Sequence, residues 1–99
     1  MSQEPYEMPE VRSVKVLPDY KLLVTFQNDV AKIFNCKEKM FWHPASVKIH
    51  DPANFKTAKV GCGTVIWLDG EVDIDPENLW DDGEIVKDPE PGQEFVRRR

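Results

Sequence analysis

Residues 63–80 constrain the fold more than any other stretch of this chain. They read GTVIWLDGEVDIDPENLW, with Asp69-Gly70 at the centre. This pair favours a two-residue hairpin loop, because Asp and Gly both tolerate the positive φ of a type I′ turn. The register that follows pairs Leu68 with Glu71, Trp67 with Val72, Ile66 with Asp73 and Val65 with Ile74. The stretch therefore predicts an antiparallel β-hairpin.

The predicted register divides this hairpin into two faces. One face is apolar and is predicted to be core: Val65, Trp67, Val72 and Ile74. The other face mixes apolar and acidic side chains: Thr64, Ile66, Leu68, Glu71, Asp73 and Asp75. Asp69 is explained by the turn, and Asp75 by a helix start. Four residues remain without a folding role and are our candidate partner-binding residues, named here the mixed face: Ile66, Leu68, Glu71 and Asp73.

A second antiparallel hairpin is expected nearer the N-terminus. Tyr20, Leu22, Val24 and Phe26 alternate with polar residues and should share one buried face. A β-favouring run over residues 11–17 precedes them, and Pro18 stops it. The turn after Phe26 contains Asn28-Asp29. A two-residue loop places Val24 opposite Ile33, and a three-residue loop shifts that register by one, so both alternatives stay open.

Short helices and one more strand complete the expected elements. Asp51-Pro52 and Asp75-Pro76 are helix starts, because Asp caps the first turn and proline suits the first helical position. Residues 36–42 are consistent with one or two helical turns, which end before Pro44. A strand is expected from 56 or 57 to 60, a turn at 61–63, and an extra strand near 84–86. The fold class is α+β, with antiparallel β-hairpins and two short helices in a single small domain. That domain spans 9–82, between a flexible N-terminal arm (1–8) and a charged C-terminal tail (83–99).

The charge of the chain is strongly polarised. Residues 1–68 have a net charge of +2, residues 69–94 have one lysine against eleven acidic residues, and the last five add three arginines. An acidic segment attracts basic partners and repels phosphates. We therefore expect a protein partner with a basic surface and no direct nucleic-acid binding, since Arg97–Arg99 are a weak signal. Because no apolar run could span a bilayer and no secretory signal is recognised, no membrane contact and a cytoplasmic location are expected.

The chemistry-bearing residues do not form a recognised catalytic motif. Cys36 and Cys62 are interpreted as buried thiols, and the acidic residues of 69–77 as surface, turn and cap residues, so no metal or cofactor is expected. The chain is predicted not to be an enzyme. The alternative is a small enzyme or ligand-binding domain with a pocket near Trp42, His43, His50 and Cys62. The tryptophans at 42, 67 and 80 are expected to be mainly core anchors, and Trp80 is the one expected to be partly exposed.

The order and spacing of these residues resemble a small bacterial family known only as a domain of unknown function, number 2442. The resemblance covers residues 9–80, and its distinctive part runs from Gly63-Thr64-Val65-x-Trp67 to Asp73-Ile74-Asp75-Pro76-Glu77. It implies a compact α+β domain, alone or fused to a helix-turn-helix, in gene arrangements like toxin–antitoxin pairs. It implies no activity, cofactor or catalytic residue. No helix-turn-helix follows Trp80 here.

Three hypotheses follow from the sequence. The first is an uncharacterised bacterial, non-enzymatic protein-interaction domain, as one member of a toxin–antitoxin-like pair, that binds a basic partner through the mixed face. The second is the enzyme or ligand-binding domain with the pocket described above. The third is a regulatory homodimer closed through Ile66 and Leu68, since a domain this small has a marginal core.

Overall fold

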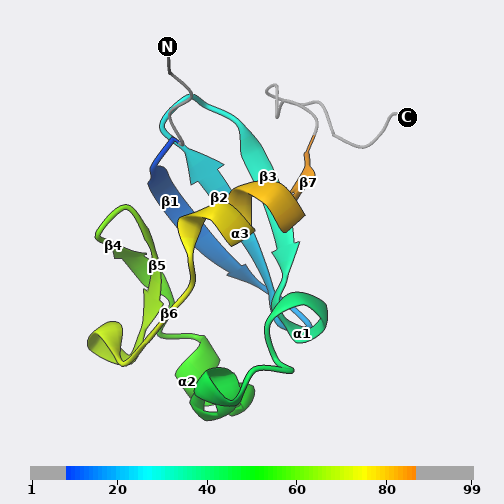
Figure 1. Cartoon of the computed structure of the whole chain (residues 1–99), viewed down its shortest axis with the longest axis vertical. Helices are drawn as coiled ribbons and strands as arrows, with labels where there is room; N and C mark the ends of the chain where they lie inside the picture. Colours follow the sequence, from blue (N-terminus) through cyan, green and yellow to red (C-terminus); the bar gives the residue numbers. More distant parts are fainter. Residues whose placement is uncertain (1–8, 87–99) are drawn as a thin grey trace.

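Two antiparallel sheets organise the computed structural model, which describes residues 9–86 (Figure 1). The larger sheet has the order β1-β2-β3-β7, and its strands are β1 (Val11–Leu17), β2 (Lys21–Phe26), β3 (Ala31–Asn35) and β7 (Glu84–Ile85). The smaller has the order β4-β5-β6, with β4 (Lys59–Gly61), β5 (Thr64–Trp67) and β6 (Val72–Asp73). The predicted α+β class is confirmed. The predicted arm and residues 87–99 of the predicted tail lie outside the described residues.

Five short helical segments connect the strands. They are α1 (Cys36–Lys39), the 3₁₀ helix η1 (Pro44–His50), α2 (Pro52–Phe55), the 3₁₀ turn η2 (Leu68–Gly70) and α3 (Pro76–Asp82). Both predicted Asp-Pro starts are confirmed. The Asp51 carboxylate accepts from the Ala53 N–H, and the Asp75 carboxylate from the Glu77 N–H, each at 2.9 Å. η1 was not predicted, because its sequence carries no clear amphipathic period.

The β5–β6 hairpin has the predicted register. Ile66 lies opposite Asp73 and Trp67 opposite Val72. Asp69 and Gly70 both have positive φ, 55° and 100°, as a type I′ turn requires. Val65, Trp67, Val72 and Ile74 are buried as predicted. Thr64 was predicted on the same side of the hairpin as the mixed face, but it is buried too. Its buried hydroxyl donates a hydrogen bond to the Ile74 carbonyl at 2.7 Å.

The β2–β3 hairpin has the three-residue loop. Val24 lies opposite Lys32 and Leu23 opposite Ile33, which is the register shifted by one. The loop is Gln27 to Asp29, and the Phe26 N–H donates to the Val30 carbonyl at 2.8 Å. Asp29 has a φ of 70°, so it adopts the left-handed conformation that commonly ends such a loop. Leu22, Val24 and Phe26 are buried as predicted.

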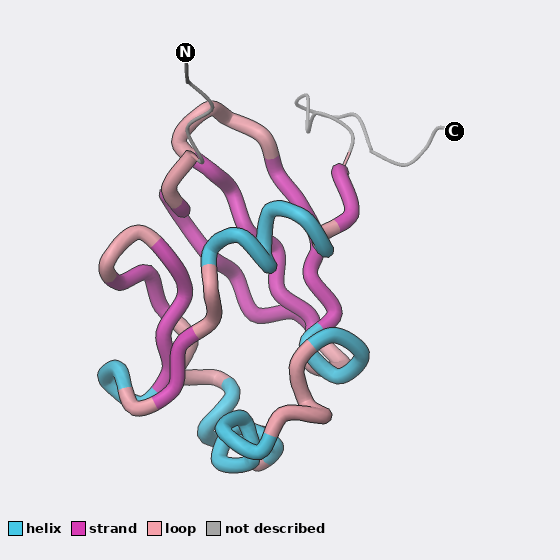
Figure 2. The backbone as a smooth tube through the Cα atoms, viewed as in Figure 1, coloured by secondary structure: helices cyan, strands magenta, loops and turns pink. Residues whose placement is uncertain are grey.

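The core lies between the two sheets and the helices. Its largest fully buried side chains come from β2, β3, η1, β5 and α3, namely Leu22, Val24, Phe26, Phe34, Ile49, Val65, Trp67 and Leu79. The sheets meet where the Val11 N–H donates to the Gly63 carbonyl at 3.0 Å. Figure 2 shows that the chain leaves the small sheet after β6 and crosses to the larger sheet as α3. After α3 the chain forms β7, which pairs with β3. None of the helices in the described part of the chain is long and apolar enough to cross a membrane.

Two predictions about individual side chains are wrong. Cys36 is buried, but Cys62 is exposed, because it occupies the turn between β4 and β5 with a φ of 52°. Trp42 is 73% exposed and is not a core anchor. Its indole N–H donates to the Lys39 carbonyl at 3.0 Å, which holds the ring against the end of α1. Trp80 is partly buried, with its ring edge-on to Phe26.

Candidate protein-binding groove

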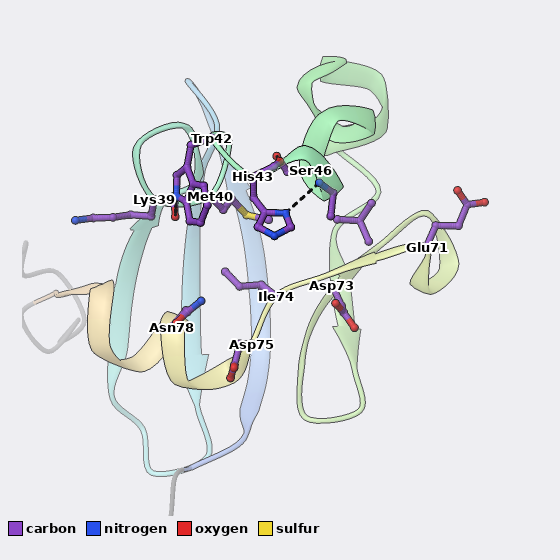
Figure 3. Close-up of a pocket in the computed structure, with 12 residues that line it drawn as sticks. Lys39, Met40, Trp42, His43, Ser46, Glu71, Asp73, Ile74, Asp75 and Asn78 are labelled. Atoms are coloured by element: carbon purple, nitrogen blue, oxygen red, sulfur yellow. Dashed lines mark hydrogen bonds between the residues drawn. The ribbon is translucent and has the colours of Figure 1, made fainter.

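A groove of about 300 Å³ opens between the α1–η1 segment and the β6–α3 segment (Figure 3). Its first wall includes Met40, Trp42, His43 and Ser46. Its second wall includes Glu71, Asp73, Ile74, Asp75 and Asn78. The volume is at the lower end of the range for ligand sites in proteins. An exposed indole and several carboxylates therefore border one concave surface.

Local hydrogen bonds fix the first wall. His43, the residue before Pro44, has an extended backbone conformation. Its Nδ1 accepts a hydrogen bond from the Ala45 N–H at 3.1 Å. Nδ1 is thus an acceptor, so in the neutral ring the proton is on Nε2. The Ser46 hydroxyl donates to the His43 carbonyl at 2.8 Å. His43 and Ser46 were missed as a pair by sequence reasoning, although His-Pro before a short helix is a capping signal.

The second wall follows from the hairpin and the α3 cap. The Ile74 N–H donates to the Val65 carbonyl at 3.3 Å, so the chain stays on the small sheet until the Asp75 cap. Asp73 lies opposite Ile66 in the ladder and is exposed. Glu71 forms an ion pair with Lys48 at 2.9 Å. Asp73 has no ion-pair partner among residues 9–86.

The structure separates the four residues of the mixed face. Ile66 packs over Gly61 so closely that a Cβ on Gly61 would lie 2.5 Å from Ile66 Cδ1. Leu68 packs against the core, and its N–H donates to Thr57 Oγ1 at 2.9 Å. Both residues therefore have folding roles. Glu71 and Asp73 line the groove.

The four residues of the alternative pocket are only partly brought together. Trp42 and His43 line the groove, whereas His50 and Cys62 do not. The His50 ring stacks on Phe41 with a centroid separation of 4.2 Å, and its Nε2 lies 3.3 Å from Ser46 Oγ. Within the described part of the chain, no three His, Cys, Asp or Glu side chains are placed to hold a metal ion.

Acidic residues continue from the groove along α3 to β7. Six carboxylates lie in this acidic track, defined as Asp73, Asp75, Glu77, Asp81, Asp82 and Glu84. The four ion pairs of residues 9–86 involve other acidic residues: Asp19, Asp29, Asp69 and Glu71. At one of them, the hydrogen bond and charge of Lys37 lower the pKa of Asp19. No carboxylate of the acidic track forms an ion pair within residues 9–86, although Asp81 interacts with the charge of Lys32, so the track attracts cations.

Comparison with known proteins assigns a family. A family model described as "Protein of unknown function (DUF2442)" matches residues 11–84. The chain belongs to the DUF2442 family. The DUF2442 match runs from the first residue of β1 to the first residue of β7, so it includes both walls of the groove. No curated protein and no solved structure matches the chain.

Membership of DUF2442 confirms the resemblance noted in the sequence and assigns no chemistry. The residues of the groove must therefore be interpreted from their own contacts. Trp42, Glu71 and Asp73 all lie within the DUF2442 match, on segments that the sequence separates by almost thirty residues. The fold brings them to one surface through the packing of η1 against β6.

Proposed function

We propose that this DUF2442 protein is a non-enzymatic domain that binds a basic segment of a protein partner in the groove. The observation that carries the proposal is the position of Trp42, exposed on one wall, with the carboxylate of Asp73 on the other. A lysine or arginine over a tryptophan face is stabilised by about 0.5–1 kcal/mol at an exposed site. A carboxylate beside the same cation adds attraction and orientation.

The contacts within the groove support binding rather than catalysis. Ser46 is the hydroxyl group of the lining, and it is 1% exposed with its proton donated to the His43 carbonyl. His43 is a helix cap, and Asp75 is another. A nucleophile needs access to substrate, which the buried Ser46 hydroxyl lacks even though His50 Nε2 lies 3.3 Å from it.

The proposed cellular setting follows from the family resemblance. We place the protein in the cytoplasm, as one member of a toxin–antitoxin-like pair, so the product of the adjacent gene is the first partner to test. A charge-complementary partner gives an association rate that falls with added salt. This dependence separates the proposed binding mode from simple apolar adhesion.

Calorimetric titration of the full chain with the adjacent gene product tests the proposal. Trp42→Ala and Asp73→Lys should each weaken binding by about tenfold or more, since both remove a central contact. Two matched controls lie outside the groove lining. Val47→Ala truncates an exposed apolar side chain, as Trp42→Ala does, but on η1. Asp82→Lys makes the same change of charge as Asp73→Lys, but at the end of α3. Equal losses in all four variants, or none, would contradict the proposal.

A further inference from the structure

We infer that the groove takes its partner as an extended β-strand, which adds to the edge of the small sheet at β6 and carries basic residues at alternate positions. This binding mode rests on the proposed function, because it concerns the same groove and the same basic segment. It adds the conformation of that segment and the pattern of its side chains.

The small sheet ends at β6, which pairs only with β5 in the described part of the chain. The Ile74 N–H donates to the Val65 carbonyl, so the backbone groups of Ile74 and of Val72 point toward β5. Those of Asp73, which lies between them, point to the other side, because the direction alternates along a strand. No backbone group of residues 9–86 pairs with the Asp73 N–H or carbonyl. The outer edge of β6 is therefore open at Asp73.

This open edge borders the groove. Five consecutive residues line the groove, from Glu71 to Asp75. Their side chains alternate between two faces of the segment: Val72 and Ile74 are buried, whereas Glu71, Asp73 and Asp75 are exposed. A cavity that touches both sets runs along the backbone between them. The Asp75 N–H, two residues further along this extended segment, faces the same way as the Asp73 groups and has no backbone partner among residues 9–86.

The edge offers enough hydrogen-bonding groups to hold a short strand. Asp73 supplies a donor and an acceptor, and Asp75 supplies a second donor, since the Asp75 carbonyl already accepts from Asn78 and Leu79 in α3. Main-chain hydrogen bonds to a sheet edge supply affinity, and alternate side chains supply specificity. The groove volume of about 300 Å³ corresponds to roughly ten liquid water molecules. A three-residue stretch of extended chain can therefore pair with this edge.

The side chains beside the edge specify which residues the strand carries. Figure 3 shows Asp73 and Asp75 on the same side of the segment and Ile74 on the other side, toward the first wall. Neither carboxylate forms an ion pair within the described residues. Neighbouring side chains on one face of a sheet interact, and opposite charges stabilise the pair. An added strand thus places a lysine or arginine beside each carboxylate and a small apolar residue between them, against Ile74.

One cation belongs to the lining of the groove and leaves this pattern intact. Lys39 lies on the first wall, and Figure 3 shows its side chain pointing away from the second wall. It forms no ion pair within the described residues. The acidic side of the β6 edge is therefore accessible to cations from a partner.

Backbone N-methylation of a peptide tests whether the segment binds as a strand. The probe is acetyl-SKVKS-amide, with its two lysines beside Asp73 and Asp75. The N–H groups of both lysines then face β6, and those of the valine and the last serine face away. Methylation at both lysines should weaken binding to the full chain by about tenfold or more, because a hydrogen bond is lost and the methyl groups prevent close approach. Methylation at the valine and the last serine is the matched control and should change the affinity by less than about threefold.

Nuclear magnetic resonance of the ¹⁵N-labelled full chain locates the contact. The amide signals of Asp73 and Asp75 should shift on addition of acetyl-SKVKS-amide, and exchange of these two amides with solvent should slow. The peptide acetyl-SKKVS-amide has the same composition and charge but lacks the alternation. It should bind about two- to fivefold more weakly, because only one lysine then lies beside a carboxylate.

The outcomes separate this binding mode from the proposed function. If methylation at the lysines and at the control positions has equal effects, or if the signals of Asp73 and Asp75 do not shift, the strand mode is wrong. The proposed function then still stands if Trp42→Ala and Asp73→Lys weaken binding of the adjacent gene product. If methylation discriminates but both variants bind that gene product like wild type, the β6 edge is a peptide site and the proposed function fails.

Discussion

The ammonium group of Lys32 lies 3.9 Å from the centroid of the Trp80 ring and donates a hydrogen bond to the Trp80 carbonyl. Lys32 is only 7% exposed, which is rare for lysine. The carbonyl belongs to the last turn of α3, where cations interact favourably with the helix dipole. Lys32 therefore fastens α3, and with it the second wall of the groove, to β3.

Lys32→Met should destabilise the fold by about 1–2 kcal/mol, because the Trp80 carbonyl loses a charged donor. Burial lowers the pKa of Lys32, while the charge of Asp81 opposes the shift. A lysine with a lowered pKa in the folded state loses its proton more readily there than in the unfolded chain, so wild type gains stability as pH rises toward 10.5. Urea titrations at several pH values should show the deficit of Lys32→Met widening in that direction. A deficit that narrows would contradict this assignment, and Asp81→Asn is the control for the neighbouring charge.

Gly83→Ala should destabilise the protein by about 1–3 kcal/mol through overpacking. A Cβ at this position would lie 2.7 Å from the Leu79 carbonyl oxygen and 3.0 Å from Lys32 Cβ. Neither neighbour is a free side-chain end, so the backbone between α3 and β7 must shift. Asp82→Ala is the matched control one residue away and should leave the thermal midpoint nearly unchanged. An equal midpoint for both variants would show that this junction has room to spare.

Cys36 should make the fold sensitive to alkaline pH. Burial raises the pKa of its thiol from 9.0 to about 12. The group's contribution is complete below pH 9 and is lost as pH rises from 9 to about 12, because only the unfolded thiol ionises in that window. The free energy of unfolding of wild type should fall by up to about 1.4 kcal/mol per pH unit there, relative to Cys36→Ala. Cys62→Ala, which changes the exposed cysteine, should follow wild type.

Trp42 and Trp67 should respond in opposite ways to truncation. Trp67 is fully buried, and its replacement by Ala should cost about 3–5 kcal/mol. Trp42→Ala should change the free energy of unfolding by less than about 1 kcal/mol, because it removes only an exposed ring and its hydrogen bond to Lys39. Chemical denaturation checks both values. A large loss in Trp42→Ala would mean that its exposed ring has a folding role and is not free for a partner.

Local signals explain what the sequence predicted correctly. The two Asp-Pro caps and the Asp69-Gly70 turn depend on a few adjacent residues, so they can be predicted without knowing the rest of the fold. The alternation from Leu22 to Phe26 likewise reports its own buried face. These signals were enough for the α+β class and for the register of the β5–β6 hairpin.

Contacts between segments that are distant in the sequence explain which features were not predicted. The burial of Lys32 depends on Trp80, which lies 48 positions away. Ile66 acquired a packing role from Gly61 on the neighbouring strand, so it was not free as the pattern suggested. The groove itself forms between η1 and β6, and the periodicity of neither segment predicts that the two lie next to each other. Hydrophobicity alone favoured a buried Trp42, but its exposed ring is held by a hydrogen bond from the indole N–H to the Lys39 carbonyl.

The pairing of β7 with β3 has a consequence for how the protein is made. β3 is synthesised some fifty residues before its partner Glu84 emerges from the ribosome. Until then the edge of β3 is open, Lys32 has no carbonyl to cap, and the segment that becomes the second wall of the groove is unfastened. The nascent chain can therefore complete its fold only after nearly all of the matched family region has been translated. The second wall of the groove is therefore secured only after β7 has been translated.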